Sequence, residues 1–170
     1  MKKLFFVICA ILIAASGFAQ KDLISSVFEK YAGTDGITTV NMTGDMLKLI
    51  TQAEMERRDT VFSSTLSEIR VLAVEDECEK PSGLNLKTEV YDKLDKSVYK
   101  EMLTVKQTNE DVVIMVKESE GRIKEMLVIV GGSKDNALIQ IKGDMLLSEL
   151  ADMAGKYQMK GFEQLKKLDK

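Results

Sequence analysis

YKEMLTVKQ at Tyr99 to Gln107, VVIMVKE at Val112 to Glu118, RIKEMLVIV at Arg122 to Val130 and ALIQIK at Ala137 to Lys142 are four strand-like runs in the second half of the chain. Turn-like segments at 108–111, 119–121 and 131–136 separate them. Apolar, β-branched runs joined by short turns favour neighbouring antiparallel strands. The sequence therefore predicts a β-meander of adjacent antiparallel strands.

The third run indicates what each face of this sheet carries. Alternate residues of a strand point to opposite faces. Alternation divides the run into two sets, Ile123, Glu125, Leu127 and Ile129 against Lys124, Met126, Val128 and Val130. Both sets become apolar toward the end of the run, so we expect helices to cover at least one face.

The first half alternates between helical and strand-like patterns. Asp22 is predicted to cap a helix that Gly33 ends, and the β-branched stretch Ile37 to Met42 is predicted to be a strand. Thr43-Gly44-Asp45 then opens a second helix through Ile50 or Ala53. The apolar residues at helical spacing are Leu23, Ile24, Val27, Phe28 and Tyr31 in the first helix and Met46, Leu47, Leu49, Ile50 and Ala53 in the second.

Further elements are expected around the meander. Asp59 can cap a helix ahead of a strand from Ile69 to Val74, and an acidic loop from Glu75 to Gly83 follows. A helix precedes the meander and another, starting at Gly143-Asp144, ends it. The residues that these helices carry at helical spacing are Val61, Phe62, Thr65 and Leu66, then Leu86, Val90, Tyr91 and Leu94, and last Met145, Leu146, Leu147, Leu150 and Met153.

A short repeat links two of these positions. Gly44-Asp45-Met46-Leu47 and Gly143-Asp144-Met145-Leu146 each follow a strand-like run. Glycine permits a strand-to-helix turn, and aspartate accepts hydrogen bonds from the free amides of a new helix. We interpret both copies as structural caps, because the carboxylate would repel a bound anion.

These patterns predict an α+β fold. The prediction is a largely antiparallel five- to six-stranded sheet with helices packed mainly on one face, in a single domain over residues 20–158. Residues 159–170 are expected to form a lysine-rich tail or short helix.

The first nineteen residues are typical of a secretory signal peptide. Lys2 and Lys3 precede the apolar run Leu4 to Ala15, and Gly17 and Ala19 have the small side chains of a cleavage site. The run is too short to span a bilayer, so no permanent membrane anchor is expected. We expect an exported protein in the periplasm or outside the cell.

Composition removes several classes of function. The chain of 170 residues has 24 Lys or Arg, 27 Asp or Glu and no histidine. Without histidine there is no Ser-His-Asp or Cys-His catalytic system and no imidazole metal site. The acidic balance disfavours nucleic-acid binding. After cleavage Cys78 is alone between two glutamates, which leaves open a free thiol or a disulfide between chains.

Chemical motifs are weak. Gly131 to Lys134 lacks the spacing of a phosphate loop, and Ser97 and Lys100 have Ser-x-x-Lys spacing at the start of a strand instead of on a helix. The acidic residues 75–79 lack the order of a calcium loop. Asp59-Thr60-Val61 matches an O-glycan acceptor triplet, and whether Thr60 carries a glycan is left open. No catalytic, cofactor or metal residue is predicted.

The hydrophobic patterns resemble a known family. MLTVKQ, VVIMVKESEGRIKEMLVIVGG, LIQIKGDMLLSEL and GITTVNMTGDMLKLI are similar to segments of domain of unknown function 4252, an uncharacterised family of exported Bacteroidetes proteins. The family pattern at this junction is of the type Gly-Asp-Ile-Asp-Leu, and where it has its second acid this chain has Leu146. The resemblance implies an envelope or extracellular location and transfers no catalytic residue.

We therefore expect a non-catalytic binding or interaction module of the bacterial cell envelope, whose partner is an envelope protein or a small ligand. Two alternatives remain open at this point. One is a small hydrolase that uses carboxylates or a serine with a lysine, and the other is a structural subunit that assembles with itself.

Overall fold

The computed structural model describes residues 22–55, 65–74, 83–133 and 135–146. They form a six-stranded sheet in the order β1-β2-β6-β5-β4-β3, and every neighbouring pair is antiparallel. The predicted fold class is confirmed. The strands are β1 (Ile37–Thr43), β2 (Leu66–Val74), β3 (Tyr99–Lys106), β4 (Glu110–Ser119), β5 (Arg122–Gly132) and β6 (Asn136–Met145).

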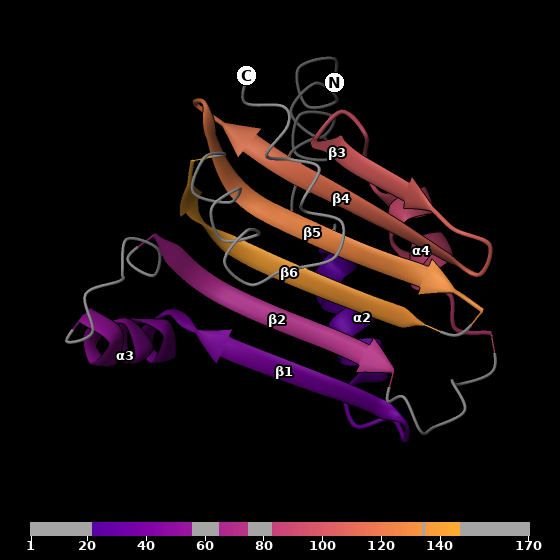
Figure 1. The fold of residues 1–170 in the computed structure, drawn as a ribbon, viewed down its shortest axis with the longest axis horizontal. Coiled ribbons are helices and arrows are strands. Elements are labelled where there is room, and N and C mark those ends of the chain that lie inside the picture. The colour runs from indigo at the N-terminus through magenta and orange to yellow at the C-terminus, as the bar shows by residue number, and fades with distance from the viewer. Residues whose placement is uncertain (1–21, 56–64, 75–82, 134, 147–170) are drawn as a thin grey trace, which may run out of the picture.

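The four predicted meander strands are β3 to β6, and they are consecutive neighbours in the sheet. Glu120 and Gly121 make the turn between β4 and β5, and both have positive φ, of 56° and 71°. Strands β1 and β2 extend the sheet beyond β6 (Figure 1). This order leaves β1 at one edge and β3 at the other.

Two helices cover one face of the sheet. Figure 1 shows α2 (Leu23–Tyr31) and α4 (Leu86–Glu89) behind the strands. Asp22 caps α2 as predicted, since its Oδ1 accepts a hydrogen bond from the amide of Ile24 at 3.2 Å. The predicted helix through Leu94 is interrupted, because α4 is followed by the separate 3-10 helix η2 (Tyr91–Lys93).

Apolar side chains form one cluster on each face of the sheet. The helix-covered face buries Ile24, Val27, Phe28, Tyr31, Ile37, Leu72, Leu84, Leu86, Val90, Leu94, Tyr99, Val113, Met115, Leu127, Ile129 and Leu138. The second face buries Leu47, Leu66, Ile114, Val116, Ile123, Met126, Val128, Ile141 and Met145. Hydrophobic contact on both faces explains why the central strands are almost continuously apolar.

Helix α3 (Gly44–Met55) begins directly after β1, as the Gly44-Asp45 pattern predicted. Its expected apolar face is only partly correct. Leu47 is buried in the cluster on the second face, whereas Met46 is 51% exposed and Leu49 is 62% exposed. These two exposed side chains belong to neither apolar cluster.

The second Gly-Asp copy does not open a helix at Gly143. Residues 143–145 belong to β6, because Gly143 pairs with Leu66 of β2 and Met145 pairs with Ile123 of β5. Asp144 does not cap a helix there; its carboxylate forms ion pairs with Arg122 at 2.8 Å and Lys124 at 2.5 Å. The remainder of the predicted final helix lies outside the described residues.

Two smaller predictions are also wrong. Leu66, placed in the helix that Asp59 was expected to cap, is the first residue of β2; residues 56–64 lie outside the described residues. Ile123 was expected to share a face with Leu127, yet it packs in the cluster on the second face. A register shift between Ile123 and Glu125 reverses the alternation at that point.

Candidate functional site

A shallow groove lies between helix α2 and the edge strand β1. Its volume is about 220 Å³ and it is open to solvent. One wall comes from α2, the other from β1, and a single side chain comes from β2. The lining residues are Phe28, Glu29 and Ala32 of the α2 side, Thr39, Val40 and Asn41 of β1, and Arg70 of β2.

The strand register explains which side chains of β1 line the groove. Ile37 of β1 is buried in the helix-side cluster, so alternation places Thr39 and Asn41 on the same face as α2. Asn41 pairs with Arg70 across the two strands. Val40, which is 40% exposed, has its side chain on the opposite face and forms the rim of the groove.

Arg70 is held in a fixed position at the base of the groove. Its Nε donates a hydrogen bond to Gln140 Oε1 at 2.7 Å, and its Nη2 donates to Ser25 Oγ at 3.1 Å. The guanidinium also lies 4.4 Å from the centroid of the Phe28 ring. Arginine suits this role because one planar group can stack on a ring and donate several hydrogen bonds.

The contacts of Arg70 continue into a buried polar chain under α2. Gln140, fully buried on β6, donates a hydrogen bond through Nε2 to Glu125 Oε1. The Tyr99 hydroxyl donates to the other oxygen, Glu125 Oε2, at 2.9 Å. Burial, together with the charge of Glu125, raises the pKa of the Tyr99 hydroxyl, which therefore stays a donor. The chain links β3, β5, β6 and β2 to the first turn of α2.

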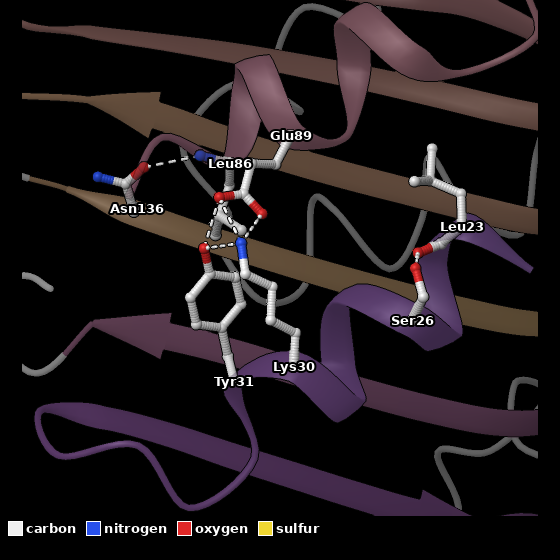
Figure 2. Close-up of polar contacts among 7 residues, drawn as sticks. All are labelled: Leu23, Ser26, Lys30, Tyr31, Leu86, Glu89 and Asn136. Carbon is white, nitrogen blue, oxygen red and sulfur yellow. Dashed lines mark hydrogen bonds and ion pairs between the residues drawn. The ribbon is translucent and has the colours of Figure 1, made fainter. Parts of the chain in front are cut away.

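A second set of polar contacts fixes the other end of α2 (Figure 2). Lys30 Nζ lies 2.9 Å from Glu89 Oε2, and the Tyr31 hydroxyl donates to Glu89 Oε1 at 2.5 Å. Burial would raise the pKa of Glu89, but the hydrogen bonds from Tyr31 and Lys30 and the charge of Lys30 outweigh it and lower that pKa. We call Lys30, Tyr31 and Glu89 the helix clamp, since they join α2 to α4.

Helix α4 is itself tied to the sheet. The amide of Leu86 donates a hydrogen bond to Asn136 Oδ1 of β6 at 3.0 Å, which Figure 2 also shows. Lys87 pairs with Asp111 of β4 at 2.6 Å. The groove therefore has one wall on a helix attached at both ends and the other on a strand of the sheet.

The arrangement is suited to recognition. An apolar wall with a few oriented polar groups is typical of binding sites in proteins. Thr39 and Asn41 can donate and accept hydrogen bonds, and Arg70 carries a positive charge beside the negative charge of Glu29.

The structure separates the pair with Ser-x-x-Lys spacing. The Ser97 hydroxyl donates to Asp95 Oδ1 at 2.6 Å in the turn before β3. Lys100 is on β3 and forms an ion pair with Glu118 at 3.0 Å. Each group has a different partner, so the lysine is not placed to activate the serine.

Gly131 and Gly132 are the last residues of β5, where the sequence predicted a turn. A Cβ on Gly131 would lie 2.6 Å from Lys87 Cβ, so this glycine permits the close approach of α4. Lys134, Thr60, Cys78 and the acidic residues 75–79 lie outside the described residues. Within the described part of the chain no group of three or more Cys, Asp or Glu side chains is placed to hold a metal ion.

In the same part of the chain no helix is long and apolar enough to cross a membrane. The sequence pointed to none of the residues around the groove as a site, although it placed Phe28 on a helix and Glu125 in an otherwise apolar run. The charge at Glu125 was the available signal, because a charged residue among core positions requires a buried partner.

The fold and groove define an α+β domain built on an antiparallel meander extended by β2 and the edge strand β1. The family model of domain of unknown function DUF4252 matches residues 31–153. The chain therefore belongs to the DUF4252 family. No curated protein and no solved structure matches it.

Proposed function

We propose that this chain is an exported, non-catalytic binding module of the bacterial cell envelope, and that the groove between α2 and β1 is its recognition site. The proposal rests on one observation: both walls of the groove, helix α2 and strand β1, are fixed to the rest of the fold. Helix α2 is fixed by the helix clamp at one end and by the polar chain through Arg70 at the other. A preformed site loses little conformational entropy when it binds.

The exposed surface of the groove supports binding of another molecule. Thr39 and Asn41 are exposed residues of β1 on the face that carries α2, and Arg70 stacked on Phe28 lies beside them. A mixed apolar and polar surface of this kind can select a ligand by shape and by hydrogen bonds.

Export rests on the sequence alone. The basic start, the apolar run and the small residues Gly17 and Ala19 support cleavage before Gln20. Mass spectrometry of the native protein tests this part, and the expected amino terminus is Gln20. An intact Met1 terminus recovered from the cytosol would remove the envelope location from the proposal.

Binding is tested by a pair of variants on adjacent residues. Thr39→Trp places a large ring in the groove, whereas Thr38→Trp places the same ring on the other face of β1. Each purified chain is immobilised and exposed to envelope extract. We expect polypeptides retained by the wild type and by Thr38→Trp to be lost with Thr39→Trp. The same retained proteins on all three chains would contradict a role for the groove.

The hydrolase alternative has no arrangement in its favour among the described residues, since Ser97 and Lys100 have separate partners. Self-assembly remains a competing explanation for an exposed edge strand, and light scattering of the purified chain distinguishes it from binding of a different partner.

A further inference from the structure

The two edge strands of the sheet differ in how they are protected against pairing. Strand β3 carries Lys100, Glu101 and Lys106, and its pairing with β4 shifts register between Glu101 and Leu103. Charges and bulges at an edge are the usual obstacles to adding another strand. Strand β3 therefore has both of these obstacles.

Strand β1 has neither obstacle. Its sequence ITTVNMT contains no charge and no proline, and its seven residues pair with β2 in an unbroken register from Ile37↔Val74 to Thr43↔Glu68. Within the described part of the chain, no strand pairs with its outer edge (Figure 1). A regular, uncharged edge of this length presents a row of backbone groups for another strand.

The groove runs beside this same edge. A strand added to β1 would place alternate side chains on the α2 face, next to Thr39, Asn41 and the walls formed by Phe28 and Ala32. Recognition of extended peptides at a sheet edge combines these two features, because backbone hydrogen bonds supply affinity and pockets for alternate side chains supply specificity.

We propose that the partner is an extended, uncharged polypeptide segment that adds to β1 as a seventh strand and inserts an apolar side chain into the groove. This inference rests on the proposed binding function and names its partner class. A segment from a different protein fits better than a second copy of this chain. Antiparallel self-pairing centred on Val40 would bring Asp35 and Asp45, which flank the two ends of β1, close to each other between the copies, and would place the polar Thr39 and Asn41 of the second copy beside the centre of the groove instead of an apolar side chain.

The probe is a library of random seven-residue linear peptides, selected on the immobilised full chain. Affinities of the selected peptides are then measured by calorimetry with the wild type, Thr39→Trp and Thr38→Trp. We expect Thr39→Trp to weaken binding at least tenfold and Thr38→Trp to change it less than threefold. Selected peptides should have an apolar residue at one position and few charges.

Backbone pairing is tested on the peptide, so that no protein variant has to fold. N-methylation at successive positions should weaken binding at least tenfold at alternate residues and little at the residues between them. Amide hydrogen exchange of the protein should slow at least tenfold at alternate positions of β1 when peptide is bound, with no change along β3.

The possible outcomes distinguish strand addition to β1 from binding at the groove alone. Peptides that depend on Thr39 but protect no β1 amides would overturn strand addition and leave the groove as a binding site. Failure to select any peptide would also overturn strand addition, while loss of envelope partners with Thr39→Trp would still support the groove. A concentration-dependent dimer that protects β1 without peptide would make the second copy the occupant and overturn the proposed partner.

Discussion

The hydroxyl of Tyr99 donates a 2.9 Å hydrogen bond to the carboxylate of Glu125, and this pair lies inside the helix-covered face of the sheet. Glu125 is only 7% exposed and accepts a second hydrogen bond from Gln140. A buried carboxylate is tolerated only when it is paired and hydrogen-bonded. The stability of this part of the molecule therefore depends on each donor.

Tyr99→Phe should lower the free energy of unfolding by about 1–3 kcal/mol, because it leaves a buried carboxylate oxygen without its donor. Urea denaturation followed by circular dichroism measures the change. The control is Tyr91→Phe, which removes a hydroxyl that donates to Glu101 at the exposed side of β3. We expect the control to cost less than about 1 kcal/mol. Equal losses in the two variants would show that Glu125 does not need the Tyr99 donor.

Arg70→Lys should also be destabilising although it keeps the charge. Lysine cannot both stack on Phe28 and donate to Gln140 and Ser25 in this geometry. We expect a loss of about 1–2 kcal/mol in the free energy of unfolding.

The control for Arg70 is Arg122→Lys, because Arg122 contacts both the carboxylate and the carbonyl oxygen of Asp144, and contacts between partly exposed groups contribute little. The same denaturation measurement applies to both variants. If Arg70→Lys is as stable as Arg122→Lys, the planar group of Arg70 is not what fixes the base of the groove.

Gly143→Ala tests whether Gly143 lies in strand β6 or at the start of a helix. A Cβ at this position would lie 2.4 Å from the carbonyl oxygen of Thr65, which is backbone and cannot move independently. We expect a loss of about 1–3 kcal/mol from overpacking. The comparison is Gly121→Ala, where no atom lies within 4 Å and only the positive φ of 71° is unfavourable for alanine. A helix start at Gly143 would instead tolerate alanine with a small loss.

The helix clamp predicts a dependence of stability on pH. The pKa of Glu89 is lowered in the folded chain, so its carboxylate stabilises the fold above its ordinary value of 4.5, and this contribution is lost as the pH falls through the lowered value. Thermal unfolding of the wild type and of Glu89→Gln should therefore differ at neutral pH and converge in acid.

The alkaline side of the same clamp has the opposite sign. The pKa values of Tyr31 and Lys30 are both raised, Tyr31 by burial first and Lys30 by its hydrogen bond to Tyr31 first. Their contribution is complete below the ordinary values of 10.0 and 10.5 and is lost as the pH rises through the raised ones. A difference between wild type and Glu89→Gln that stays constant from acid to alkali would contradict the clamp.

Local patterns in the sequence predicted much of the fold. The meander and the helix from Leu23 to Tyr31 were correct because apolar periodicity, turn residues and the Asp22 cap all act over a few neighbouring residues. Gly143 was misread because the same Gly-Asp pair opens α3 at Gly44, and only pairing with Leu66 distinguishes the two positions. That pairing joins residues far apart in the chain.

The groove could not be predicted in the same way. It requires β1 to lie at an edge beside β2, and Arg70 to reach Phe28 across the sheet face. Neither relation leaves a local pattern in the sequence. Ile123 shows the same limit on a smaller scale, because a single bulge reverses the face that strict alternation assigns to it.

The two edges of the sheet differ, and this difference limits how many copies of the domain can join edge to edge. If a guest strand adds to β1 as proposed, a guest that is itself a copy of this domain would leave β3, the charged and irregular edge among the described strands, at both outer ends. We expect such an assembly to stop after one addition, because the charged side chains of Lys100, Glu101 and Lys106 disfavour pairing of a further strand at β3.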